Sequence, residues 1–189
     1  FPVDLEYLQR FIEIKVEKDP KEFMIIHAPT DYHVKGTVFI ENTILKLKNK
    51  YPFICYKRLE NLPKAKVYEE LIKADIVIDQ MLVGFYGVFA IEAMALRKPV
   101  ICYIRPDIWE NIKEFNPIIN ANPDNLQEVI EKFLDDKNTL QEIGEKSREY
   151  VTKYHNPIII AEKILKLFNT ENWMNFLKNF SKDTIAYGL

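Results

Sequence analysis

The stretch from residue 79 to residue 100, DQMLVGFYGVFAIEAMALRKPV, combines a strand end, a loop with two glycines, a helix and the start of another strand. The helix is predicted from about Val88 to Leu96 and is apolar except for Glu92. Backbone N–H groups at a helix N-terminus attract anions, and a glycine such as Gly87 lets a phosphate approach closely. A carboxylate one turn into the helix can accept hydrogen bonds from sugar hydroxyls. The stretch therefore has the elements of an anion site next to a carboxylate that can bind a sugar.

The rest of the chain alternates between apolar runs and amphipathic segments. Strands are predicted at residues 23–28, 53–56, 76–78, 100–104 and 118–119. Further helices are predicted at residues 37–50, up to residue 73, and at 122–134, 138–154, 158–168 and 171–180. This alternation favours an α/β fold with a Rossmann-like parallel sheet flanked by helices. We expect a lead-in segment at 1–22 (an edge helix or a hinge), a Rossmann-like domain at 23–169 and a C-terminal helix at 170–189.

The overall composition excludes several classes of protein. The chain has 189 residues, so a single domain is expected, and at 48% hydrophobic residues it can bury a core. Its 26 basic and 28 acidic residues give a net charge of −2, which offers no electrostatic case for nucleic acid or membrane binding. No apolar run approaches the roughly 18 residues that span a bilayer. Cys55 and Cys102 lie in apolar runs, which favours two reduced, buried thiols in a cytoplasmic protein.

Ligands of parallel α/β sheets bind at the carboxyl ends of the strands. Three loops should meet at that edge, at residues 27–36, 57–63 and 79–87. Lys35, before Gly36 at a helix start, could bind a diphosphate, or it could be an ordinary surface lysine. Asp79 could bind sugar hydroxyls, although we favour a structural role as a turn cap. His27 is more consistent with a core histidine than with a phosphate ligand.

Other kinds of site lack support in the sequence. The three histidines share no metal-binding spacing, and neither cysteine belongs to a C-x-x-C pair, so no metal site is expected. The glycine patterns of dinucleotide-binding and P-loop proteins are absent, as is the G-x-S-x-G pattern of hydrolases. No cofactor is expected apart from the substrate.

The stretch around Glu92 resembles the donor-binding half of GT-B glycosyltransferases of the family-4-like kind, the glycosyl transferases group 1. That family typically reads E-G-F-G-x-x-x-x-E-A-M-A-x-G-x-P-V, and Tyr86-Gly87, residues 92–95 and Pro99-Val100 match it. Gly84 stands where the family has its first glutamate, and Arg97-Lys98 replaces the glycine before the proline. The loop at residues 30–34 also lacks the arginine that the family often carries there.

The resemblance implies roles for individual residues. Lys35 and Gly36, with the backbone at Gly87 and Val88, would bind the diphosphate of a nucleotide-sugar, either a UDP-sugar or a GDP-sugar. Glu92 would bind the ribose hydroxyls, whereas the alternative from the residues alone is a partly buried glutamate paired with a lysine. Lys35 and Glu92 are thus the expected catalytic residues. Tyr86 could contact the donor sugar or the partner domain, or it could equally pack against the sheet.

The resemblance implies a retaining, metal-independent transfer of a hexosyl group from the nucleotide-sugar to a glycan, lipid or other acceptor. We expect this chain to be cut from a longer protein, without the acceptor-binding N-terminal domain, and we therefore expect weak or no turnover by this half alone. The full-length protein would be cytoplasmic, with a peripheral position at the inner membrane face as an option. Two alternatives remain: another GT-B-fold enzyme such as a sugar-nucleotide epimerase, or a non-enzymatic flavodoxin-like module that binds a partner.

Overall fold

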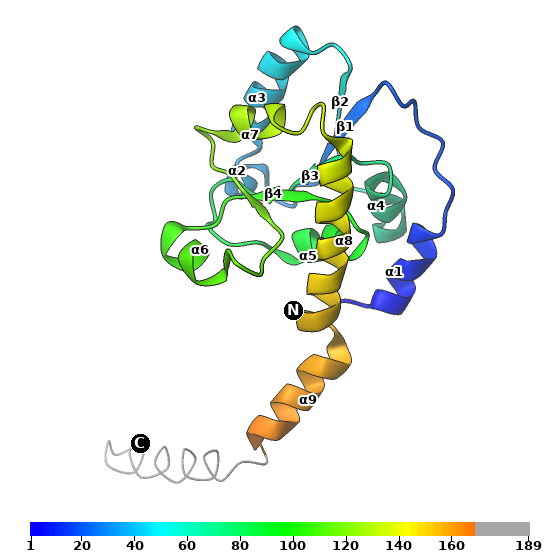
Figure 1. Cartoon of the computed structure of the whole chain (residues 1–189), viewed down its shortest axis with the longest axis vertical. Coiled ribbons are helices and arrows are strands. Elements are labelled where there is room, and N and C mark those ends of the chain that lie inside the picture. The colour runs from blue at the N-terminus through cyan, green and yellow to red at the C-terminus, as the bar shows by residue number, and fades with distance from the viewer. Residues whose placement is uncertain (169–189) are drawn as a thin grey trace.

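The computed structural model describes residues 1–168, and these residues form a parallel α/β sheet flanked by helices (Figure 1). The strands are β1 (Phe23–His27), β2 (Ile54–Arg58), β3 (Ile76–Ile78), β4 (Val100–Cys102) and β5 (Ile119–Asn120). Within the described part the sheet has five strands in the order β2-β1-β3-β4-β5, all parallel. The predicted Rossmann-like fold class is therefore confirmed, and each predicted strand is present.

Helices connect the strands and cover both faces of the sheet. They are α1 (Leu5–Ile12), α2 (Tyr32–Lys35), α3 (Thr37–Lys50), α4 (Lys64–Leu71), α5 (Val88–Ala95), α6 (Pro106–Ile112), α7 (Leu126–Glu131), α8 (Lys137–Tyr154) and α9 (Pro157–Phe168). Of these, α2 and α6 were not expected. The helix predicted at 171–180 lies outside the described residues.

Side chains of β1 alternate between two hydrophobic cores, one on each face of the sheet. Met24 and Ile26 belong to a core shared with α1, α4, α5 and the C-terminal part of α8. Phe23 and Ile25 belong to a second core, on the other face, shared with α3 and α7. Successive side chains of a strand point to opposite faces, so a wholly apolar strand implies that both faces are covered.

The N-terminal segment is part of this packing. Asp4 caps α1 by accepting a hydrogen bond from the backbone of Tyr7 at 2.8 Å, and Leu8 and Phe11 bury the inner face of the helix. Arg148 of α8 donates to the backbone oxygen of Leu5 at 3.3 Å. Of the two options for residues 1–22, the edge helix therefore describes residues 5–12.

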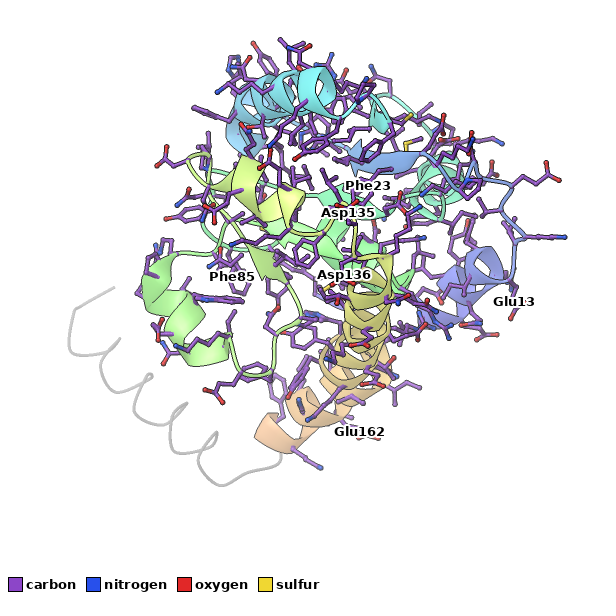
Figure 2. The ribbon with its side chains drawn as sticks, turned by 45° about the horizontal axis from the view of Figure 1, so that its top comes forward. Glu13, Phe23, Phe85, Asp135, Asp136 and Glu162 are labelled. Carbon is purple, nitrogen blue, oxygen red and sulfur yellow. The ribbon has the colours of Figure 1, made fainter. Side chains whose placement is uncertain are left out.

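The long helix α8 closes the domain on the side of α5. Figure 2 labels Asp136, whose carboxylate caps the start of α8, and Glu162 on α9. Gly144 allows α8 to approach the backbone at Arg97, because a Cβ at position 144 would lie 2.3 Å from the backbone oxygen of Arg97. Beyond α8, α9 extends away from the sheet (Figure 1).

Candidate functional site

The sheet order creates a crevice at the carboxyl ends of β1 and β3. After β1 the chain turns outward to β2, and after β3 it turns the other way to β4. Ligands of open α/β sheets bind where the strand order reverses in this way. The predicted loops at residues 27–36 and 79–87 follow these two strands. The fold thus places both loops at the switch point.

A pocket of about 590 Å³ opens at this edge, and we call it the edge pocket. It is lined by residues 28–30 after β1, residues 59–62 after β2, residues 64, 67 and 68 of α4, and residues 88, 89 and 92 of α5. Two of the three expected loops line it. The loop at 79–87 does not line the pocket, and the first turns of α5, which follow it, do so instead.

Glu92 lies in the wall of the edge pocket and is only 9% exposed. One of its oxygens, Oε1, accepts hydrogen bonds from Lys64 Nζ at 2.6 Å and from the Tyr68 hydroxyl at 2.9 Å. Burial, together with the negative charge of Glu92, raises the pKa of Tyr68, so this hydroxyl remains a proton donor. The carboxylate is therefore held in place through Oε1. Both of these hydrogen bonds leave its second oxygen, Oε2, for a ligand. A lysine pair and a sugar-binding role are both compatible with this arrangement.

A second cavity meets the edge pocket at Glu92. It has a volume of about 260 Å³ and shares Lys64, Tyr68, Val88 and Glu92 with the edge pocket. Its remaining wall comes from residues 2–4, 7 and 8, at the start of the chain and in α1. The N-terminal segment thus helps to enclose the candidate sugar-binding carboxylate.

Lys35 and Gly87 come together, as expected, but a third residue lies between them. Lys35 Nζ donates to Asp79 Oδ1, and the backbone N–H of Gly87 donates to Asp79 Oδ2 at 2.9 Å. Asp79 is completely buried and Lys35 is 9% exposed. Lys35 is therefore not a solvated surface lysine, and Asp79 has the structural role that the sequence favoured. Gly87 directly precedes Val88, so this cluster adjoins the edge pocket.

Gly36 and Gly84, the other two glycines of the predicted loops, adopt backbone conformations with positive φ. Gly36 has φ +71° and ends α2, with its N–H bonded to the His33 oxygen at 3.1 Å. Gly84 has φ +86°, and a Cβ there would lie 2.4 Å from Arg105 Cγ. Both conformations lie in the left-handed region that favours glycine. A glutamate at position 84 would require this loop to rearrange.

Tyr86 turns inward and does not line the edge pocket. Its hydroxyl bonds with the Tyr150 hydroxyl at 2.8 Å and lies 3.4 Å from His155 Nε2. Burial is the main reason that its pKa is raised. Of the options for Tyr86, packing describes the observed side chain. Phe85, which is labelled in Figure 2, stacks on the Tyr86 ring. Phe85 is 40% exposed.

His27 is a core histidine whose two ring nitrogens both have partners. Nδ1 lies 2.9 Å from the Ile78 oxygen, and Nε2 lies 2.9 Å from Thr37 Oγ1. Because a carbonyl oxygen only accepts, Nδ1 carries the proton and Nε2 accepts from the threonine. Burial lowers the pKa of His27, which favours this neutral form. His27 thus joins β1 to β3 and to the start of α3.

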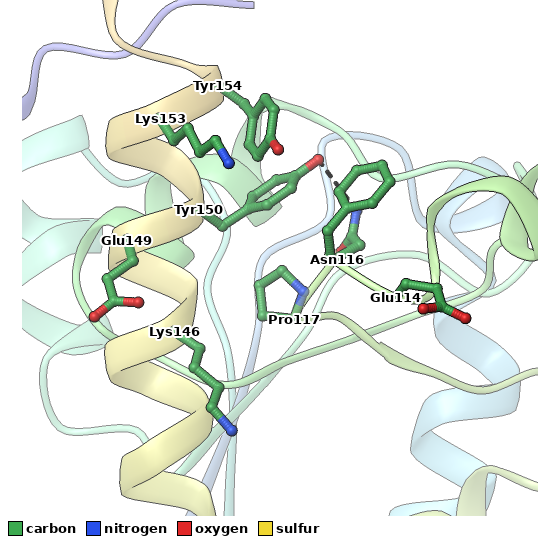
Figure 3. Close-up of a pocket in the computed structure, with 9 residues that line it drawn as sticks. Glu114, Asn116, Pro117, Lys146, Glu149, Tyr150, Lys153 and Tyr154 are labelled. Atoms are coloured by element: carbon green, nitrogen blue, oxygen red, sulfur yellow. Dashed lines mark hydrogen bonds between the residues drawn. The ribbon is translucent and has the colours of Figure 1, made fainter.

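A further pocket, of about 280 Å³, lies between α8 and residues 114–117 (Figure 3). Tyr150 and Tyr154 line it, and Asn116 donates to the Tyr150 hydroxyl at 3.2 Å. None of the predicted site residues lines this pocket.

In residues 1–168 no cluster of three or more histidine, cysteine or acidic residues could hold a metal ion. No helix in that part of the chain is long and apolar enough to cross a membrane.

Sequence reasoning missed Lys64 and Tyr68, the two partners of Glu92. Both are on α4: Lys64 is its first residue, directly after the Pro63 that marks the helix start, and Tyr68 lies about one turn further along. The available signal was their position: α4 begins at the carboxyl edge, so a cation in its first turn faces the switch point.

Comparisons with known proteins agree with this geometry. The family model described as glycosyl transferases group 1 matches residues 40–150. The chain belongs to the glycosyl transferases group 1 family. The match includes Glu92 and its surroundings, whereas Lys35 and Gly36 precede it. No curated protein sequence matches the chain.

Solved structures share the fold at low sequence identity. Trehalose-6-phosphate synthase OtsA is 9% identical with a TM-score of 0.65, over 89% of this chain and 50% of that one. TarM from S. aureus, in a complex that contains UDP, is 20% identical with a TM-score of 0.59, over 83% and 38%. A putative UDP-N-acetylglucosamine 2-epimerase from Listeria monocytogenes is 12% identical with a TM-score of 0.59, over 87% and 50%. The chain therefore spans half the length of these structures or less.

One departure from the glycosyl transferases group 1 motif has a local explanation. Arg97 occupies the position of the motif's glycine and has φ +59°, a conformation in which a side chain is strained. Its guanidinium lies 3.4 Å from Glu145 of α8. The adjacent Lys98 donates to the backbone oxygens of Ile72 and Ala74 at 2.7 and 3.1 Å, and burial lowers its pKa to about 8. The backbone at Arg97 is thus left-handed, a conformation that glycine adopts without strain.

Proposed function

We propose that this chain is the donor-binding half of a retaining glycosyltransferase, which moves a hexosyl group from a nucleotide-sugar to a glycan, lipid or other acceptor. Membership of the glycosyl transferases group 1 family supports the class of reaction. The observation that carries the proposal is Glu92, a buried carboxylate fixed by Tyr68 in the wall of a pocket at the switch point. The donor would be a UDP-sugar or a GDP-sugar, and no metal or other cofactor takes part.

The nucleoside would occupy the edge pocket. Ala28 and Pro29 on one side and Val88 and Phe89 on the other offer apolar surface for a base. Glu92 would accept hydrogen bonds from the ribose hydroxyls, which are neutral donors that a carboxylate binds well. Lys64, whose side chain is 73% exposed, can leave Glu92 and turn toward the solvent or the ligand.

The phosphates would lie next to Gly87 and Lys35, at the start of α5. Negative charge develops on the departing diphosphate during transfer, and fixed cations and backbone dipoles stabilise it. In this proposal Lys35 and Glu92 position the donor, and the acceptor and the remaining catalytic groups come from an N-terminal domain outside this chain. The protein would be cytoplasmic, and transfer by this half alone would be weak or absent.

Calorimetric titration of the chain with UDP, GDP and ADP tests the proposal. Saturable binding of one nucleotide, weakened by Glu92→Ala, would support it and identify the base. Binding of none of them by a folded chain that is joined to its N-terminal domain would contradict it.

The epimerase alternative has one observation in its favour, the structural similarity to the Listeria protein, but similarity at 12% identity extends only to the fold. Formation of an epimerised sugar from the donor alone would favour that alternative.

The strand order β2-β1-β3-β4-β5 also occurs in flavodoxin-like proteins, the other alternative. The family match makes a glycosyltransferase the better supported of the three.

A further inference from the structure

Asp79 occupies both groups that would otherwise bind a phosphate. Its Oδ2 accepts the backbone N–H of Gly87 at 2.9 Å, and its Oδ1 accepts from Lys35 Nζ. The carboxylate is completely buried, and the lysine side chain is 11% exposed. An anion that belongs to the protein therefore lies where the anion of a ligand would be expected.

Bonds other than those to the Asp79 carboxylate also hold this loop. The backbone N–H of Asp79 bonds to the Ile101 oxygen at 2.9 Å, as part of the sheet. The N–H of Met81 bonds to the Lys35 oxygen at 3.0 Å, and the Gln80 side chain donates to the Phe85 oxygen. These bonds hold residues 79–85 through main-chain atoms and Gln80. A substitution of the carboxylate leaves these bonds in place, although it removes the charge that pairs with Lys35.

We propose that Asp79 is an internal competitor for the diphosphate of the donor. The carboxylate neutralises Lys35 and takes up the Gly87 amide, so an incoming phosphate meets a like charge and finds neither group free. Recognition of the donor by this half alone then depends on the nucleoside in the edge pocket. The phosphates reach Lys35 and Gly87, as in the proposed function, only after Asp79 releases these groups. This inference refines the proposed function by assigning specificity to the nucleoside end of the ligand.

The test replaces Asp79 with asparagine, which keeps the shape and the acceptor for Gly87 but removes the charge. Inorganic pyrophosphate is the probe, because it has phosphates and no nucleoside. We expect Asp79→Asn to bind pyrophosphate at least about tenfold more tightly than the unaltered chain. Adding Lys35→Met to that variant should abolish the gain, because the released lysine is the source of it.

Asp75→Asn is the matched control. Asp75 also accepts from a lysine, Lys18, and from a backbone N–H, that of Met24 at 2.6 Å, but it lies at the opposite end of β3. Its substitution should leave pyrophosphate binding unchanged. Equal gains in the two variants would overturn the inference, because a general change in net charge would then explain them. No gain in a folded Asp79→Asn variant would also overturn it.

The unaltered chain provides a measurement that needs no variant. Titration with pyrophosphate, followed by the ¹⁵N–¹H signal of Gly87, should leave that signal in place at millimolar concentrations. A saturable shift of the signal below that range would overturn the inference even if Asp79→Asn fails to fold. Parallel titrations with uridine and guanosine separate the two proposals: nucleoside binding tests the edge pocket, whereas pyrophosphate tests Asp79.

Discussion

Replacing Glu92 with glutamine should separate ligand binding from stability. The ion pair with Lys64 contributes little to folding, because the lysine side chain is 73% exposed and such pairs contribute about 0.2–1 kcal/mol. Glutamine keeps an oxygen that can accept from Tyr68. We therefore expect the free energy of unfolding to fall by less than about 1 kcal/mol.

The effect on nucleotide binding should be larger. Hydrogen bonds to a charged partner contribute about 1.5–3 kcal/mol, so the affinity for a nucleoside diphosphate should fall by about ten- to hundredfold. The assay is calorimetric titration of the chain and of Glu92→Gln with the best-binding diphosphate and with its 2′-deoxy analogue. The unaltered chain should prefer the ribose form, and the variant should lose most of that preference.

Glu70→Gln is the matched control for this prediction. Glu70 also accepts from lysines, Lys57 at 2.7 Å and Lys73 at 2.6 Å, but it lines neither the edge pocket nor the cavity beside α1. Its substitution should leave nucleotide affinity unchanged. The reasoning is refuted if a folded Glu92→Gln variant binds the ribose form as tightly as the unaltered chain does.

Four further predictions concern stability and reactivity. Arg97→Gly should raise the free energy of unfolding by about 1 kcal/mol in urea titrations, because glycine adopts φ +59° without strain. Gly144→Ala should lower it by about 1–3 kcal/mol despite the better helix propensity of alanine, because the new Cβ would lie 2.3 Å from a backbone oxygen; an unchanged urea midpoint would contradict this. Burial lowers the pKa of His27 below its usual 6.5, so the unfolded chain binds the proton first and stability should fall as pH drops from 7.5 to 5.5, by up to about 1.4 kcal/mol per unit; a flat urea midpoint would contradict that. In the native protein the half-buried Cys55 should react with a disulfide reagent before Cys102, because Cys102 is completely buried, although burial raises the pKa of both thiols.

Most of the fold could be predicted because its signals are local. Each strand is a short apolar run, and α3 begins after a glycine and buries a periodic apolar face, so its predicted bounds are those observed. The unexpected α6 has seven residues and fully buries none of them. Only Ile108, Trp109 and Ile112 pack against the core, and a helix of this length gives a weak periodic pattern. The unexpected α2 is a single turn, capped by Asp31 and ended by Gly36, and one turn is too short for a periodic pattern.

The candidate site was predictable only in part, because its contacts join residues that are distant in sequence. Glu92 stood out as the single charge in an apolar helix, and a buried charge requires a partner. Its partner Lys64 is 28 residues away, and the partner of Lys35 is 44 residues away. The orientation of Tyr86 depends on α8, because its hydroxyl forms a hydrogen bond with the hydroxyl of Tyr150 in the interior. Such pairings follow from how helices pack, which the spacing of residues along the chain does not specify.

The two buried carboxylates at this edge differ in how easily a ligand can reach them. The partner of Glu92 is Lys64, with a side chain 73% exposed, so the lysine can leave at little cost and a ribose can replace it. The partner of Asp79 is Lys35, with a side chain 11% exposed, and separating that pair would leave an uncompensated buried charge, which is strongly destabilising. If the proposed function holds, a nucleotide-sugar engages the edge pocket through its nucleoside first. Its phosphates could gain Lys35 only if a further change at the switch point, such as the approach of another domain, stabilised Asp79 in a different way.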